Sequence, residues 1–526
     1  APTVKDARNL EHIVKGLRER GYDVPIVADI HFKPEAAMEA AKWVDKVRIN
    51  PGNYADSKKF VIREYTDEQY AAELSRIGER FSPLVDLCKK RGIAMRIGTN
   101  HGSLSDRILN RYGDTPLGMV ESALEFARIA RDHDYHAFIF SMKASNPKVM
   151  IAAYRLLVAR LNELGLDWNY PVHLGVTEAG EGEDARIKSA IGIGSLLTDG
   201  IGDTIRVSLT EDSPHEIPVA RGLVGNIRKT SNTQRPTLKV QLSFDPFSYQ
   251  RRAAEAIERD GVWLGGGELI RVVVQQASFD KIAHKIDKMG DYKPEIVYEN
   301  ANIVEIDPRD ENAIARLNQS TTAQFVTVRD DVDLAVIAAY RLLAAKLHAR
   351  HPILLKDCRL RIAGCGKDFQ ERLLLASTNI GSLLCDGIGD AVLVQSEEAP
   401  GQALRLSYNI LQAAGSRIFK TDYVACPSCG RTLFNLQTTT AKIKAATSHL
   451  KGVKIAIMGC IVNGPGEMAD ADFGYVGGAP GKVNLYVSKT AVKFNIPEAE
   501  AVDRLQDLIR EHGKWVEPAP TDIVLV

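Results

Sequence analysis

The feature that most constrains the fold of this chain is an alternation of strand-like and helix-like segments that repeats six times. Each short β-rich run ends in polar residues and precedes an amphipathic stretch; the runs are residues 24–31, 46–52, 94–100, 136–143, 172–178 and 203–208. Such alternation predicts a parallel α/β domain. We expect an eight-stranded (β/α) TIM barrel whose first two strands lie outside this sequence.

Part of this pattern occurs twice. Residues 193–203 recur almost unchanged at 380–390, and residues 151–157 recur at 337–343. Two matches in the same order indicate a duplicated part of the barrel. The pocket chemistry changes in the copy: Glu178 aligns with Cys365, Arg206 with Leu393, and Lys143 with the neighbourhood of Arg329 and Asp330. We therefore expect the copy to be a degenerate, barrel-like domain with a structural role.

Polar stretches with proline or glycine separate three expected domains. The stretch at 210–236 marks the end of the first barrel, and the stretches at 397–401 and 415–422 mark the end of the inserted domain. We expect a TIM-barrel domain at 1–230, an inserted barrel-like domain at 231–415, and a small α/β domain at 416–526.

Four cations lie at the carboxyl ends of the predicted strands, where the active site of such a barrel forms. They are Arg48, Arg96, Lys143 and Arg206. Residues two apart on a strand share a face, so Asn50, Ser141 and Ser208 accompany three of them. Four cations in one pocket repel one another unless a polyanion is bound, and a diphosphate is the natural candidate.

One acid lies at the same mouth. Glu178 occupies a Thr-Glu-Ala-Gly turn after the fifth run. It is either a general acid or base or a counter-charge for the cations, and the sequence favours neither.

The last cysteines form a candidate metal centre. Cys426 and Cys429 follow one strand-like run, Cys460 follows another, and Glu467 comes after an Asn-Gly-Pro-Gly turn. Three thiolates and one carboxylate favour an iron–sulfur cluster with one distinct iron. A structural zinc site usually has four paired Cys or His ligands, which makes zinc the weaker alternative; cysteines that hold no metal are the weakest.

Composition excludes several classes of function. Lys plus Arg and Asp plus Glu both number 67, so no net charge attracts nucleic acid or a membrane surface. No apolar run approaches the roughly 18 residues of a membrane span. Seven cysteines in 526 residues fit a reducing compartment. We expect a protein of the bacterial cytoplasm or, in a plant or alga, of the plastid stroma.

Taken together, the motifs resemble the large, three-domain form of the 4-hydroxy-3-methylbut-2-enyl diphosphate synthase family of the methylerythritol phosphate pathway. The motifs are VADIH at 27–31, VRINPG at 47–52, RIGTNHGSL at 96–104, SMKAS at 141–145, LGVTEAG at 174–180, CPSC at 426–429 and CIVNGPGE at 460–467. The similarity covers essentially the whole chain, apart from the family's opening strands.

The resemblance implies an oxidoreductase that opens 2-C-methyl-D-erythritol 2,4-cyclodiphosphate with two electrons and expels water. It implies a [4Fe-4S] cluster on Cys426, Cys429, Cys460 and Glu467, with Asn463 assisting nearby. Glu178 would donate the proton to the departing hydroxyl. The four cations would hold the diphosphate with Asn50, Asn100, Ser141 and Ser208.

The same resemblance implies ferredoxin or flavodoxin as the electron donor. Small-form relatives join barrel and cluster across a dimer, so a homodimer is one expected assembly. Two other classes remain open: a pterin-type transferase would need no reductant, and an iron–sulfur carrier would need no cationic mouth.

Overall fold

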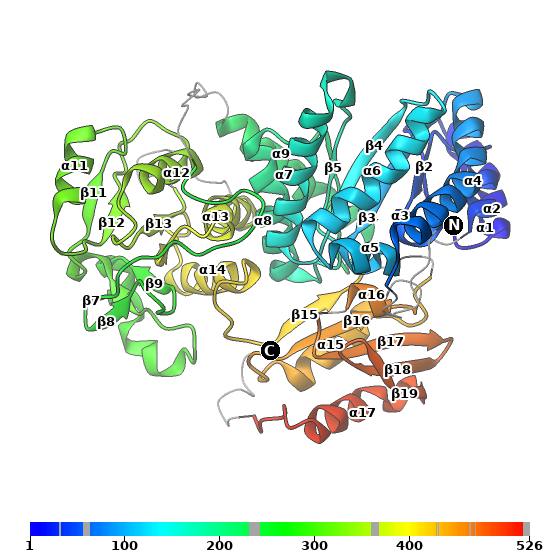
Figure 1. Cartoon of the computed structure of the whole chain (residues 1–526). Coiled ribbons are helices and arrows are strands. Elements are labelled where there is room, and N and C mark those ends of the chain that lie inside the picture. Colours follow the sequence, from blue (N-terminus) through cyan, green and yellow to red (C-terminus); the bar gives the residue numbers. More distant parts are fainter. Residues whose placement is uncertain are drawn as a thin grey trace.

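The computed structural model describes residues 1–30, 33–55, 64–230, 242–358, 368–427, 429, 431–461, 464–468 and 470–518. Two barrel-like regions lie side by side, and a C-terminal region lies below the first of them (Figure 1). One apolar core runs through both barrels, whereas the C-terminal region has cores of its own. No helix in the described ranges is long and apolar enough to cross a membrane.

The described part of the first barrel contains six parallel strands in chain order. They are β1 (Val27–Asp29), β2 (Lys46–Ile49), β3 (Ala94–Asn100), β4 (Phe138–Lys143), β5 (His173–Leu174) and β6 (Thr204–Ile205). Strands β1 to β4 form one sheet, and a parallel bridge from Phe140 to Val172 continues it towards the β5–β6 pair. All six predicted strand segments are confirmed, and the eight-stranded closure stays a prediction.

Helix α1 precedes the first strand, and the other helices follow the strands as the alternation predicts. They are α1 (Val4–Glu19), α2 (Pro34–Ala40), α3 (Pro51–Tyr54), α4 (Asp67–Arg91), α5 (Asp106–Tyr112), α6 (Pro116–Asp132), α7 (Pro147–Leu164), α8 (Gly182–Asp199) and α9 (Glu216–Thr230). Local sequence fixes their ends. In α4, Thr66 and Gln69 form a capping box, and Gly92 ends the helix with φ of 65°.

The second barrel is also built from parallel strands. A hairpin of β7 (Ile257–Arg259) and β8 (Val262–Leu264) precedes β9 (Arg271–Val274), β10 (Ile296–Val297), β11 (Val304–Ile306), β12 (Val326–Val328), β13 (Leu354–Lys356) and β14 (Ala391–Leu393). Strand β9 pairs with both β10 and the last strand, β14, which is how a barrel closes. Its helices are α10 (Gln276–Ile282), α11 (Glu311–Gln319), α12 (Val336–Lys346), α13 (Phe369–Cys385) and α14 (Pro400–Ala413).

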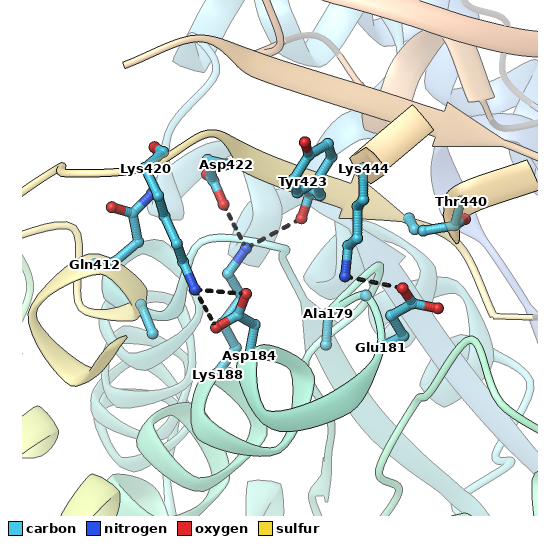
Figure 2. Close-up of a pocket in the computed structure, with 13 residues that line it drawn as sticks. Ala179, Glu181, Asp184, Lys188, Gln412, Lys420, Asp422, Tyr423, Thr440 and Lys444 are labelled. Atoms are coloured by element: carbon cyan, nitrogen blue, oxygen red, sulfur yellow. Dashed lines mark hydrogen bonds and ion pairs between the residues drawn. The ribbon is translucent and has the colours of Figure 1, made fainter. Parts of the chain in front are cut away.

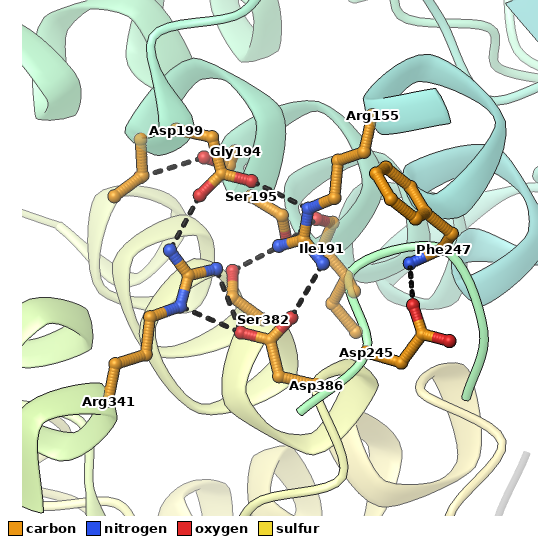
Figure 3. A network of polar contacts seen from close by, with 11 residues as sticks. Arg155, Ile191, Gly194, Ser195, Asp199, Asp245, Phe247, Arg341, Ser382 and Asp386 are labelled. Carbon is orange, nitrogen blue, oxygen red and sulfur yellow. Dashed lines mark hydrogen bonds and ion pairs between the residues drawn. The ribbon is translucent and has the colours of Figure 1, made fainter. Parts of the chain in front are cut away.

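The repeated segments pack against each other. Helices α8 and α13, which carry the repeat, lie together (Figure 3), and Ser195 Oγ donates to Ser382 Oγ over 2.6 Å. A side chain at Gly194 would collide with Thr378, and one at Gly381 would collide with Ile191. Both positions therefore require glycine for this close approach.

The ion pairs at this contact are reciprocal. Arg155 donates to Asp199 and Asp386 over 2.8 Å each, and Arg341 donates to the same two carboxylates over 2.6 and 2.8 Å (Figure 3). Arg155 and Arg341 are equivalent in the repeat, as are Asp199 and Asp386. The two barrels thus meet through the same surface on each side, as in the interface of a two-fold dimer.

The C-terminal region, residues 422–518, is a five-stranded sheet with helices. The strands are β15 (Asp422–Ala425), β16 (Lys454–Met458), β17 (Phe473–Ala479), β18 (Lys482–Val487) and β19 (Thr490–Pro497), in that spatial order. The helices are α15 (Leu436–Thr447), the single turn α16 (Gly464–Glu467), and α17 (Glu498–Glu511). Strands β15, β16 and β17 are parallel to one another, and β18 is antiparallel to both of its neighbours, β17 and β19. The predicted small α/β fold is confirmed, while the domain boundaries at 230 and 415 stay predictions.

Candidate active site

The four predicted cations line one cavity of about 110 Å³ at the mouth of the first barrel. Strand register brings them together, because Arg48 lies directly opposite Arg96, and Lys143 lies opposite Asn100. Arg48, Arg96 and Lys143 are buried, whereas the Arg206 side chain is 41% exposed.

This cavity has an uncompensated positive charge. Arg96 and Lys143 have no hydrogen-bond or ion-pair partner among the described residues. Burial and the neighbouring cations hold the pKa of Lys143 well below its usual range and lower the pKa of Arg96 to about 10. The same two causes lower the pKa of His173 to about 2. A bound polyanion would relieve this repulsion.

A hydrogen-bonded chain connects the cations with the C-terminal region. Arg48 donates to Asp29 over 2.8 Å, to the Gly98 carbonyl over 2.8 Å and to Asn100 Oδ1 over 3.0 Å. The Asn100 amide in turn donates to Glu467 Oε1 over 2.6 Å. Asn100 therefore links the barrel cations directly to the carboxylate on α16.

Glu178 is held beside the C-terminal region in a strained conformation. Its φ is +49°, in the left-handed region, which is uncommon for a residue other than glycine. The next residue, Ala179, forms a parallel bridge with Ala425, directly before Cys426. Burial and the nearby Glu467 raise the pKa of Glu178 well above its usual range. This shift favours the protonated form of the Glu178 carboxyl group.

Three cysteines line the same cavity from the opposite side. Cys426 follows β15, Cys429 lies three residues further on, and Cys460 follows β16; Glu467 lines the cavity with them. The Gly459 amide donates to Cys426 Sγ over 3.2 Å. No three His, Cys, Asp or Glu side chains of the described segments already lie close enough to hold a single metal ion. The four groups instead surround a shared space, as ligands of a larger cluster would.

The other predicted site residues divide into two groups. Asn100 and Ser208 line the cavity, but Asn50 and Ser141 are buried outside it. Asn50 donates to Ser103 Oγ over 2.7 Å and accepts from the Gly52 amide at the start of α3. Asn463 lies outside the described residues. A direct substrate contact by Asn50 or Ser141 stays a prediction.

Three lysine–carboxylate pairs join residues 420–444, at the start of the C-terminal region, to α8 and its N-cap residue Glu181 (Figure 2). The pairs are Lys188 with Asp422 at 2.9 Å, Lys420 with Asp184 at 2.8 Å, and Lys444 with Glu181 at 2.9 Å. Above the mouth, Gly102 approaches α16 so closely that a Cβ there would lie 2.5 Å from the Glu467 Cα atom. Together these contacts place the cysteines over the barrel mouth within one chain.

Three polar or charged residues that line the cavity are not among those predicted from the sequence: Asp29, Thr177 and Arg431. Asp29 lies at the end of the first strand-like run, where the rule that selected the cations applies equally to an acid. Thr177 directly precedes Glu178. Arg431 lies two residues after Cys429, and its position next to a metal-binding motif is the signal that could have drawn attention to it.

The fold and this cavity define a TIM-barrel enzyme with a cation-lined mouth that a cysteine-bearing region covers. Comparison with known proteins agrees. The family model described as "GcpE TIM-barrel domain" matches residues 1–221, and "GcpE protein C-terminal domain" matches residues 422–511.

Curated relatives extend over nearly the whole chain. A protein of Akkermansia muciniphila named 4-hydroxy-3-methylbut-2-en-1-yl diphosphate synthase (flavodoxin) is 59% identical over 98% of this chain and 88% of its own length. The synthase of Chlorobaculum tepidum, also named for flavodoxin, is 43% identical over 98% and 83%. The chloroplastic, ferredoxin-named synthase of Arabidopsis thaliana is 42% identical over 98% and 81%. The chain belongs to the GcpE family of 4-hydroxy-3-methylbut-2-en-1-yl diphosphate synthases and is an oxidoreductase of isoprenoid biosynthesis.

Proposed function

We propose that this chain converts 2-C-methyl-D-erythritol 2,4-cyclodiphosphate to (E)-4-hydroxy-3-methylbut-2-enyl diphosphate. Two electrons enter one at a time, the bond between a ring carbon and its phosphate oxygen breaks, and a hydroxyl group leaves as water after protonation. One observation carries the proposal: a single cavity combines four barrel cations, of which Arg96 and Lys143 have no partner among the described residues, with three thiols, the Glu467 carboxylate and the buried Glu178, whose pKa is raised.

The chemistry of the donors fits a [4Fe-4S] cluster held by Cys426, Cys429, Cys460 and Glu467. The cluster would supply single electrons and a Lewis-acidic iron. Glu467 already accepts a hydrogen bond from Asn100, so its position depends on the residues that would hold the substrate. Flavodoxin or ferredoxin, for which the relatives are named, would deliver the electrons.

The barrel residues bind the substrate and transfer the proton. Arg48, Arg96, Lys143 and Arg206 hold the diphosphate, and Ser208 contributes a hydroxyl group at the same wall. Glu178 is buried and its pKa is raised, which favours the protonated form, so it donates the proton to the leaving hydroxyl. The C-terminal region covers the mouth and excludes water from the reaction.

The proposal is tested by measuring iron and sulfide content, the EPR spectrum and turnover of the whole protein prepared without oxygen. We expect about four irons and a matching amount of sulfide per chain, an EPR signal after reduction that changes on addition of the cyclic diphosphate, and turnover with reduced flavodoxin or ferredoxin. Cys460→Ser should lose the iron, whereas Cys385→Ser, at a buried cysteine of α13, should keep it. Bound zinc, or a signal that the substrate leaves unchanged, would contradict the proposal.

A further inference from the structure

Arg431 is a cation that the C-terminal region contributes to the cavity. It lines the same space as the four barrel cations, although it comes from the loop after β15. It is the one Lys or Arg side chain of the described part of the C-terminal region that lines this cavity. The anion site at the barrel mouth therefore has charge on both of its walls.

One side of the Arg431 guanidinium is directed at Cys429. Burial alone would raise the pKa of the Cys429 thiol, but the backbone amide and the guanidinium of Arg431 lower it. In contrast, Arg431 Nη1 is buried and has no hydrogen-bond partner within the described ranges. A buried donor without a partner is energetically unfavourable. A ligand oxygen in the cavity would remove that cost.

Asp29 indicates where such an oxygen would lie. Its carboxylate accepts from Arg48 over 2.8 Å, and Asp29 lines the same cavity as Arg431. The Asp29 side chain is 42% exposed. One small carboxylate thus lies in a cavity that has guanidinium groups on both of its walls. A diphosphate has more charge and more acceptor oxygens, so it satisfies both walls better.

We propose that Arg431 is a fifth diphosphate-binding cation, and that the bound diphosphate holds the C-terminal region against the mouth of the first barrel. This inference rests on the proposed function and names a residue that selects its substrate. A diphosphate reaches both walls, whereas a single phosphate reaches only one. The site therefore favours diphosphates over monophosphates in the closed arrangement.

The experiment is calorimetric titration of inorganic pyrophosphate and of inorganic phosphate into the whole protein, with and without its iron. We expect Arg431→Gln to weaken pyrophosphate binding at least ~10-fold while changing phosphate binding little. Arg431→Lys should recover part of the loss. Arg206→Gln tests whether the cations of the barrel wall bind pyrophosphate, and it should weaken that binding. Arg504→Gln, at an exposed arginine of α17, should bind as the unmodified protein does.

A second readout follows the contact between the two regions. Pyrophosphate should protect the α16 amides from hydrogen exchange in the unmodified protein and in Arg504→Gln, but not in Arg431→Gln. A merely structural role of Arg431 would leave the protection intact.

The outcomes separate the inference from the proposed function. If Arg206→Gln weakens pyrophosphate binding and Arg431→Gln does not, the inference is overturned and the anion site stands. If Arg431→Gln weakens binding only in the iron-loaded protein, Arg431 acts through the metal centre, and the inference is again overturned. If neither variant affects binding, the anion site itself is wrong, and the proposed function fails with it.

Discussion

The two barrels of this chain share a framework but differ in whether the buried cations at their mouths have ion-pair partners. At the first mouth, Lys143 and Arg96 are buried without a partner among the described residues, and the cavity measures about 110 Å³. At the second mouth, Lys356 pairs with Asp330 at 2.6 Å, and the cavity there measures about 20 Å³. In the second barrel, the charge of the buried lysine at the mouth is therefore neutralised by a carboxylate of the same barrel.

The buried acids show the same contrast. Asp357 of the second barrel accepts from the Ser396 hydroxyl and from the Gln395 amide over 2.7 Å. Glu178 of the first barrel has a buried Oε2 atom without a partner in the described structure. Folding normally satisfies buried polar groups. The first mouth therefore keeps polar groups without partners among the described residues, as our proposal of a ligand site requires, whereas the second mouth satisfies its own buried acid.

The largest expected effect is on turnover. Glu178→Gln keeps the size of the side chain but removes its acidic proton, so turnover of the cyclic diphosphate should fall at least ~100-fold. Iron content and circular dichroism should not change. Asp357→Asn makes the matching change at the second mouth, and it should leave turnover nearly normal. Near-normal turnover of Glu178→Gln would show that the buried acid of the first mouth is no more important for the reaction than the buried acid of the second.

The two buried lysines should separate binding from stability. Lys143→Met should weaken pyrophosphate binding ~10- to 100-fold, since a charge-assisted hydrogen bond contributes about 1.5–3 kcal/mol. It should not destabilise the fold, because it removes repulsion. Lys356→Met should leave binding unchanged but lower the free energy of unfolding by about 1–3 kcal/mol, because it strands Asp330. Calorimetry measures pyrophosphate affinity, and urea unfolding measures the free energy of unfolding. Equal effects of the two substitutions would show that Lys143 and Lys356 do not differ in role.

The close approach at Gly102 gives a smaller effect. Gly102→Ala would push α16 away from the first barrel and lengthen the bond from Asn100 to Glu467. We expect turnover to fall by about 10-fold or more, because small displacements of catalytic groups are costly. Gly78→Ala on α4, where a Cβ meets no atom within 4 Å, should keep activity and stabilise the helix by about 0.5–1 kcal/mol. Full activity in Gly102→Ala would show that this contact does not position α16.

The smallest effect is a pH dependence. Lys143 must be charged to bind an anion, and its pKa in the free protein is lowered. Pyrophosphate affinity should therefore fall as pH rises through that lowered pKa, by at most ~10-fold per pH unit. In the same window the unfolded chain binds more protons than the folded one, so the contribution of Lys143 to stability should rise with pH. Titrations across pH test this, and Lys143→Arg should flatten the fall in affinity.

Much of the site could be predicted because it obeys local rules. The cations come from strand ends, and parallel strands bring their carboxyl ends to one edge. The cysteines come from turns after strands β15 and β16. Asn50 shows the limit of this rule: it shares a strand face with Arg48, yet its amide is used to start α3. Asn463 lies outside the described residues, and its role stays a prediction.

By itself, the sequence determined the alternation of strands and helices, the repeat, and the residue types at the strand ends and cysteine turns, because periodicity and turn chemistry act over a few neighbouring residues. Only the tertiary structure decided which charges stay unpaired. That depends on packing between distant segments: Asp330 reaches Lys356, Arg431 faces the first barrel, and Asn100 meets Glu467 from a position 367 residues earlier in the chain. Whether a buried charge is neutralised or left for a ligand depends on such contacts, and no local pattern encodes them.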